Sequence, residues 1–170
     1  DTSGLTVIAK NPLSSAVLSD MAVHHAITRE YLAIVRGVVT PPSGTITAPL
    51  SRKPGSIIER CVDFEHGERA VTHYKTLETK NGHSLVSLQL ETGRTHQIRV
   101  HLAWKNHPIL GDTVYGHKKP ELGQSSQCLH AQALTFLHPR PGQPVTVTCD
   151  LPPYFTEVLE KLKRMQQIAP

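Results

Sequence analysis

The residues best suited to chemistry lie in one short segment, 91–103, which reads Glu-Thr-Gly-Arg-Thr-His-Gln-Ile-Arg-Val-His-Leu-Ala. Arg94, His96 and Arg99 place three cations or potential cations around a glycine turn. A guanidinium held on a rigid element can bind a carboxylate or a phosphate through two parallel hydrogen bonds. We therefore expect this segment to bind an anion.

The residues after the turn predict a helix that would hold Arg99 in place. Gly93 supplies a flexible turn, and Thr95 is suited to cap the first helical turn. Ile98 and Leu102 then recur at helical spacing. Arg99 would project from this packed base.

Histidines in the same region raise a second possibility, a metal-dependent hydrolase. His96, His101 and His107 are separated by five and six residues, so they do not return to one helical face. No carboxylate stands where a zinc protease motif needs one, and no metal site is predicted. The chain also lacks a Gly-x-Ser-x-Gly nucleophile motif, a Walker loop and a Gly-x-Gly-x-x-Gly motif. Neither a serine hydrolase nor a nucleotide cofactor is therefore indicated.

The composition fits one cytoplasmic domain spanning residues 1–170. With 38% hydrophobic and 19% charged residues the chain can bury a core, and no apolar run is long enough to cross a membrane. Its three cysteines are widely spaced and include no Cys-x-x-Cys pair, which argues against a disulfide framework and a zinc knuckle. The net charge of +4 favours polyanionic partners only weakly.

The elements that would position the chemical residues begin with a strand at 5–9 and a helix at 12–25. Pro12 suits the first turn of this helix. The apolar residues that fall on one helical face are Leu13, Val17, Leu18 and Met21. Because the strand starts almost at residue 1, we expect the chain to be a fragment or a trimmed form of a longer protein.

Most of the remaining elements are expected to be strands. They are predicted at 31–39, 71–77, 84–90, 129–137 and 144–149. Asn81-Gly82 is a strong signal for a hairpin between two of them. An amphipathic helix marked by Phe155, Val158, Leu159 and Leu162 should cover the sheet, and 51–69 is either a basic excursion or a solvated loop. The predicted fold is α+β, with a mixed, largely antiparallel sheet and flanking helices.

Two further residues have ordinary structural explanations when they are considered alone. Tyr31 begins an apolar strand, where it would serve as a core or edge aromatic. Asp112 follows Leu110-Gly111, and its carboxylate is expected to cap backbone donors of a turn.

Taken together, the motifs resemble the RluA-type RNA pseudouridine synthases. The matching segments, in order along the chain, are 2–5, 31–37, 67–74, 92–101, 107–116 and 129–131. Six ordered motifs over about 130 residues are far more specific than any one of them.

The resemblance implies isomerisation of uridine within RNA, without a cofactor and through an aspartate nucleophile. In the family this aspartate belongs to the pattern Arg-Leu-Asp-x-x-Thr-Ser-Gly, and counting back from Thr2 places it two positions before Asp1. Asp1 itself occupies a variable position and is not assigned that role. Residues 1–170 are therefore expected to be one catalytic domain that lacks its N-terminal portion and is inactive alone. An upstream S4 RNA-binding domain is common among relatives.

The resemblance also assigns roles to individual residues. Tyr31 matches the tyrosine that stacks on the target uracil and is a candidate for removing the proton at carbon five. Arg99 matches the arginine that pairs with the catalytic aspartate. Arg94 and His96 would either contact phosphates or fix the turn, and Arg29 replaces the family's usual lysine while keeping its charge.

The implied partner is structured RNA, and ribosomal RNA is the expected class, with no membrane and no nucleotide cofactor involved. The target base would be extruded from its stack to reach the pocket. The alternative is a non-catalytic RNA-binding protein that has kept the synthase fold.

Overall fold

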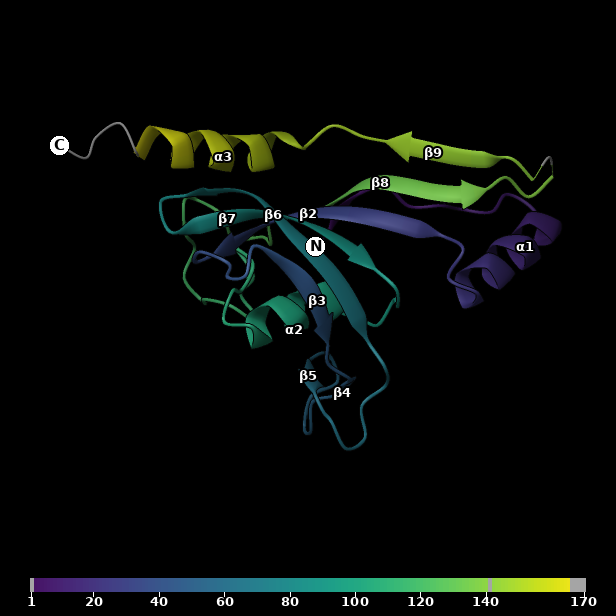
Figure 1. The fold of residues 1–170 in the computed structure, drawn as a ribbon, viewed down its shortest axis with the longest axis horizontal. Helices are drawn as coiled ribbons and strands as arrows, with labels where there is room; N and C mark the ends of the chain where they lie inside the picture. The colour runs from purple at the N-terminus through teal and green to yellow at the C-terminus, as the bar shows by residue number, and fades with distance from the viewer. Residues whose placement is uncertain (1, 141, 166–170) are drawn as a thin grey trace.

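The computed structural model describes residues 2–140 and 142–165 of the chain (Figure 1). Asp1, to which no catalytic role is assigned, lies outside the described residues. The elements are β1 (Ser3–Gly4), α1 (Pro12–Val23), β2 (Thr28–Arg36), β3 (Ser43–Thr47), β4 (Leu50–Arg52), β5 (Arg60–Val62), β6 (Val71–Lys80), β7 (His83–Leu90), α2 (Gln97–Trp104), β8 (Leu129–Leu137), β9 (Pro144–Thr148) and α3 (Pro153–Met165).

The main sheet has the strand order β1-β8-β2-β7-β6-β3, and β9 also pairs with β8. The pairing of β1 with β8 is parallel and every other pairing in this sheet is antiparallel. Strands β4 and β5 form a separate small sheet near α2 (Figure 1). The predicted α+β fold with a mixed, largely antiparallel sheet is therefore confirmed.

The hairpin between β6 and β7 forms where the sequence predicts it. Asn81 and Gly82 have φ angles of 48° and 68°, the left-handed values that a tight two-residue hairpin turn requires. Both flanking strands run longer than predicted, to Lys80 and from His83, because pairing continues up to the turn.

The core lies on both faces of β2 and β7. Ala33, Ile34 and Val35 of β2 are completely buried, which explains why this part of β2 is continuously apolar. The predicted cover by the last helix is confirmed, since Phe155 and Val158 of α3 are also fully buried. No helix in the part of the chain that the structure describes is long and apolar enough to cross a membrane.

One prediction for the start of the chain needs correction. The strand is Ser3–Gly4 and not 5–9. Among the described residues, the later stretch makes a single ladder contact, from the Leu5 amide to the Ala131 carbonyl, and Ile8 is exposed. Helix α1 forms where expected, with Asn11 as its cap, but none of its residues is buried. The apolar side chains of α1 are therefore not buried by another element in the described part of the chain.

Candidate active site

An open pocket of about 300 Å³ brings together most of the predicted site residues. Tyr31 comes from β2, whereas Arg94, His96 and Arg99 come from the turn before α2 and from α2 itself. The complete lining consists of Thr2, Tyr31, Leu90, Arg94, His96, Gln97, Ile98, Arg99, Gln127 and Leu129. Of the predicted residues only Arg29 lies elsewhere.

Tyr31 lies on a central strand at a local irregularity. It pairs with Leu88 of β7 and Ala131 of β8, and the register with β8 shifts between Glu30 and Tyr31. Such a bulge re-aims a side chain while the strand stays in the sheet. Burial raises the pKa of Tyr31, and the nearby positive charge of Arg29 opposes this effect. The phenol is therefore neutral at pH 7.

Arg99 is held by a carboxylate within the chain. Its Nε donates to Asp112 Oδ2 at 2.7 Å and its Nη2 donates to Asp112 Oδ1 at 2.9 Å. The ring of Tyr115 lies against the guanidinium, with 4.9 Å from the Arg99 Cζ atom to the ring centroid. The side chain of Asp112 is 1% exposed and that of Arg99 is 12% exposed.

Asp112 has two functions in this arrangement. The predicted capping role is present, because Oδ1 accepts hydrogen bonds from the Val114 and Tyr115 amides, each at 3.0 Å. The ion pair with Arg99 was missed, since nothing in a turn motif shows which distant side chain will face it. Burial alone would raise the pKa of Asp112, but the hydrogen bonds and charge of Arg99 and the two amides hold that pKa below its ordinary value.

The turn before α2 is fixed differently from the prediction. His96 is the N-terminal flanking residue of α2, with a left-handed φ of 57° and no side-chain cap. Thr95 therefore does not cap the helix, because the chain makes its sharp turn one residue later. The buried Gln97 side chain holds the turn instead. Its Oε1 atom accepts from the Thr92 hydroxyl at 2.8 Å and from the Arg94 amide at 3.0 Å.

A buried hydrogen-bond network continues from Gln97 into the sheet. Gln97 Nε2 donates to Thr72 Oγ1 at 3.0 Å, and Thr72 Oγ1 lies 2.9 Å from His101 Nδ1. His101 Nε2 lies 2.8 Å from the Ala48 carbonyl, so Nε2 carries the proton and Nδ1 accepts from the Thr72 hydroxyl. Burial lowers the pKa of His101 despite its bond to Ala48, which keeps the ring neutral. The network anchors α2 to β6.

Arg94 and His96 both line the pocket and both fix its wall. Arg94 forms an ion pair with Glu68, and its Nε donates to the Arg69 carbonyl at 3.2 Å. His96 Nδ1 lies 2.7 Å from the Tyr115 hydroxyl. Burial, followed by the charge of Arg99, lowers the pKa of His96. The side chain of Arg94 remains 44% exposed.

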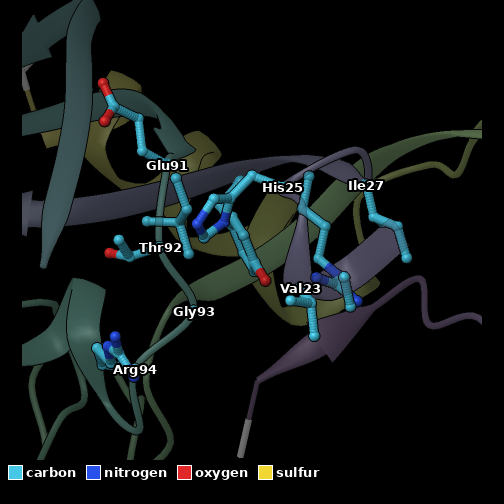
Figure 2. Close-up of a pocket in the computed structure, with 11 residues that line it drawn as sticks. Val23, His25, Ile27, Glu91, Thr92, Gly93 and Arg94 are labelled. Carbon is cyan, nitrogen blue, oxygen red and sulfur yellow. The ribbon is translucent and has the colours of Figure 1, made fainter. Parts of the chain in front are cut away.

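A second, larger pocket of about 570 Å³ adjoins the first, and it shares Tyr31, Leu90 and Arg94 with it. Arg29 lies in this second pocket. Figure 2 shows Val23 and Ile27 on one side, the backbone from Glu91 to Arg94 on the other, and the His25 side chain between them. Tyr31 therefore stands where the two pockets meet.

Strand β1 brings the start of the chain to the site. Ser3 and Gly4 pair with His130 and Ala131 of β8, which places the first and last matching motifs side by side. Gly4 has a φ of 108°, and an added Cβ would lie 2.2 Å from the Ala131 carbonyl oxygen, so only glycine fits. Thr2 lines the pocket, and its hydroxyl accepts from Gln127 Nε2 at 3.0 Å.

The histidines considered for a metal site bind separate partners. His96 contacts Tyr115, His101 lies between Thr72 and Ala48, and His107 Nδ1 lies 2.9 Å from the Arg36 carbonyl. Among residues 2–140 and 142–165, no three side chains of metal-binding type come together.

Comparison with known proteins gives one family. The family model described as RNA pseudouridylate synthase matches residues 1–104. The chain is 39% identical over 160 residues to "Uncharacterized RNA pseudouridine synthase YjbO" of Bacillus subtilis, covering 94% of this chain and 56% of that protein. It is 39% identical over 175 residues to "Ribosomal large subunit pseudouridine synthase D" of Haemophilus ducreyi, covering 96% and 53%. The chain thus spans about half the length of the curated relatives it matches.

Solved structures agree at the level of the fold. The structure titled "Human RNA Pseudouridylate Synthase Domain Containing 1" superposes with a TM-score of 0.75 at 24% identity, covering 95% of this chain and 74% of that one. "Human RNA Pseudouridylate Synthase Domain Containing 4" gives the same TM-score and identity, with 90% and 69% covered. The resemblance inferred from the motifs is confirmed: the chain belongs to the RNA pseudouridylate synthase family, in its RluA-type branch.

Proposed function

We propose that the protein containing this chain isomerises uridine to pseudouridine in structured RNA, and that its substrate is ribosomal RNA. The observation that carries the proposal is the pocket shared by Tyr31, Arg99 and Thr2, because it combines an aromatic ring, a held guanidinium and the motif that follows the nucleophile. Relatives that carry the name ribosomal large subunit pseudouridine synthase D support the choice of RNA.

The nucleophile in this proposal is an aspartate from outside residues 1–170. The family pattern places it three residues before Thr2, and three residues of extended chain span at most about 11 Å. Since Thr2 lines the pocket, this reach is long enough for the carboxylate to enter the pocket that Arg99 lines. Residues 1–170 would then be the larger part of one catalytic domain and would be inactive without that aspartate.

Arg99 would bind the nucleophile through the part of its guanidinium that Asp112 does not use. Asp112 takes the Nε and Nη2 edge, which leaves Nη1 outside this ion pair. A second carboxylate on Nη1 would have its pKa lowered by the adjacent positive charge and would stay ionised in the pocket. The ionised carboxylate is the form that can attack the sugar.

Tyr31 would stack on the extruded uracil. The base must leave its helical stack before its glycosidic bond can be reached. Stacking on an aromatic side chain contributes about 1 to 3 kcal/mol per base. After bond cleavage and rotation, the uracil rejoins the sugar through carbon five, and the Tyr31 hydroxyl is our candidate for accepting the proton that leaves this carbon. Because the phenol is neutral, its own proton must pass to solvent water in the open pocket as the carbon-five proton arrives.

Basic side chains around the two pockets would bind the RNA backbone. Arg94 and His96 lie in the first pocket, and Arg29 lies in the second. Contacts between such residues and phosphates weaken as salt concentration rises, because bound counterions are released when the complex forms. We expect the modification to occur in the cytoplasm, on ribosomal RNA.

The experiment that tests this proposal uses the complete protein and a transcript of large-subunit ribosomal RNA. The transcript carries tritium on carbon five of its uridines, and pseudouridine formation releases this label. Release would support the synthase. Tight binding without release, together with an unchanged pseudouridine map in ribosomal RNA from cells lacking the gene, would contradict it and favour a non-catalytic RNA-binding protein.

A further inference from the structure

We propose that Asp112 is a positioning residue for the reaction: it fixes the rotation of the Arg99 guanidinium so that Nη1 meets the attacking carboxylate. The inference rests on the proposed function, because it assigns a task to a residue behind the reacting groups. Asp112 does not line the pocket, whereas Arg99 does. Its effect on turnover must therefore pass through Arg99.

The geometry of the pair defines the orientation of the guanidinium. Two hydrogen bonds of 2.7 Å and 2.9 Å join the Nε and Nη2 edge of Arg99 to the two carboxylate oxygens of Asp112. A planar guanidinium bound along one edge cannot rotate about its last side-chain bonds without breaking both hydrogen bonds. The remaining Nη1 atom is thereby held in one direction.

The carboxylate of Asp112 is also held by groups other than Arg99. Asp112 Oδ1 accepts the amides of Val114 and Tyr115, and the side chain is almost fully buried. Tyr115 then closes the arrangement from another side, because its ring lies against the guanidinium and its hydroxyl contacts His96 and the Arg60 amide. Arg99 is thus restrained in its plane by Asp112 and across its plane by Tyr115.

In this arrangement one carboxylate, that of Asp112, orients the guanidinium, and a second carboxylate, the nucleophile, attacks the sugar. An arginine facing a single aspartate can bind it through either edge, so that the attacking oxygen has no fixed position. With Asp112 on one edge, only the Nη1 side is open to the attacking carboxylate. A misplacement of about 1 Å in such a contact can lower turnover about 100-fold.

The test compares Asp112→Asn with Asp63→Asn in the complete protein. Asn at position 112 keeps an oxygen for the two turn amides but removes the charge and one acceptor from Arg99. Asp63 is a matched control, because its Oδ1 also accepts two turn amides, those of Glu65 and His66, each at 3.0 Å. It has no arginine partner among the ion pairs of the described residues.

We expect Asp112→Asn to lower kcat about 100-fold, with KM for RNA within twofold of wild type. In a plot of kcat against pH, the acid limb should move to higher pH. An Arg99 guanidinium that is no longer fixed by Asp112 stabilises the ionised nucleophile less, so the pKa of the nucleophile rises. Asp63→Asn should leave kcat and the acid limb unchanged. A fall in kcat without a shift of the acid limb would overturn the positioning role and leave a purely structural one. Wild-type kcat in Asp112→Asn would also overturn it.

A measurement that does not depend on turnover can test the role of Asp112 separately from the proposed function. Hydrogen exchange of the Arg99 Nε proton, followed by nitrogen-15 NMR, should be slow in the wild-type protein and in Asp63→Asn but fast in Asp112→Asn. Slow exchange in Asp112→Asn would overturn the inference even if the protein is an active synthase. A wild-type protein that makes no pseudouridine but shows the expected exchange pattern would instead contradict the proposed function, and the inference would be overturned with it.

Discussion

Tyr31 and Arg99 line the same pocket although one lies on the central strand β2 and the other on helix α2. The strand reaches the pocket through its pairing with β7 and β8, and the helix reaches it through the buried side chains of Gln97 and His101. The site therefore depends on how firmly α2 is joined to the sheet as much as on the two residues themselves.

Substitutions of Tyr31 should separate its ring from its hydroxyl. Tyr31→Phe keeps the stacking face, so the affinity for RNA should stay within twofold of wild type. Turnover should fall about 100-fold or more, because the hydroxyl is proposed to accept the proton from carbon five. Tyr31→Leu should lose affinity as well. Single-turnover rates and filter binding measure both effects, and wild-type turnover in Tyr31→Phe would exclude the hydroxyl from the reaction.

Removing the Gln97 side chain should destabilise the fold. Gln97→Ala leaves the Thr92 hydroxyl and the Arg94 amide without their buried acceptor. The Thr92 hydroxyl is buried, and an unsatisfied buried group costs about 1 to 3 kcal/mol, so the free energy of unfolding should fall by at least about 1 kcal/mol. Gln89 is the matched control, because it is exposed on the neighbouring strand β7. Gln89→Ala should change the stability by less than about 0.5 kcal/mol in urea titrations. Equal effects would contradict the structural role of Gln97.

His101 should make the stability of the protein depend on pH. Its pKa in the folded protein is lowered by burial, whereas an unfolded histidine titrates near about 6.5. The unfolded chain therefore binds more protons below this pH, and the contribution of His101 is present above about pH 6.5 and is lost as pH falls. Between pH 7.5 and pH 5, the wild-type protein should lose more stability in urea titrations than His101→Gln does. The same loss in both proteins would show that His101 is not the titrating group.

Gly4 should tolerate no side chain. In Gly4→Ala the new Cβ would overlap the Ala131 carbonyl, which should cost about 1 to 3 kcal/mol beyond the backbone strain and should displace Thr2 from the pocket. Gly55 also has a positive φ of 77° but has open space around it, so Gly55→Ala should show only the strain of about 1 to 2 kcal/mol. Thermal unfolding and turnover measure the difference. If Gly4→Ala is no worse than Gly55→Ala, the close approach of β1 to β8 is wrong.

Local sequence signals predicted the parts of the fold that local interactions determine. The hairpin at Asn81-Gly82 needs two residues with positive φ, and these two residue types accept it. The last helix was predicted from the spacing of Phe155, Val158 and Leu162, and the same residues are buried. Both features depend on neighbours within a few positions along the chain.

The parts that were missed depend on contacts between distant segments. Thr95 has the residue type of a helix cap, but the left-handed conformation of His96 moves the helix start past it. Asp112 has the residue type of a turn, and only the packing of its loop against α2 reveals the bond to Arg99. The family resemblance supplied Tyr31 and Arg99 as a pair, which no local pattern could have joined.

The most direct test of the central claim measures tritium release from carbon-five-labelled ribosomal RNA by the complete protein with Arg99→Ala. We expect turnover to fall about 1,000-fold or more, with RNA affinity within twofold of wild type, because the nucleophile loses its proposed ion pair with the Arg99 guanidinium. Arg94→Ala is the control, since Arg94 is half exposed and bound to Glu68. It should retain turnover at saturating RNA and lose affinity in a salt-dependent way. Wild-type turnover in Arg99→Ala would contradict the account.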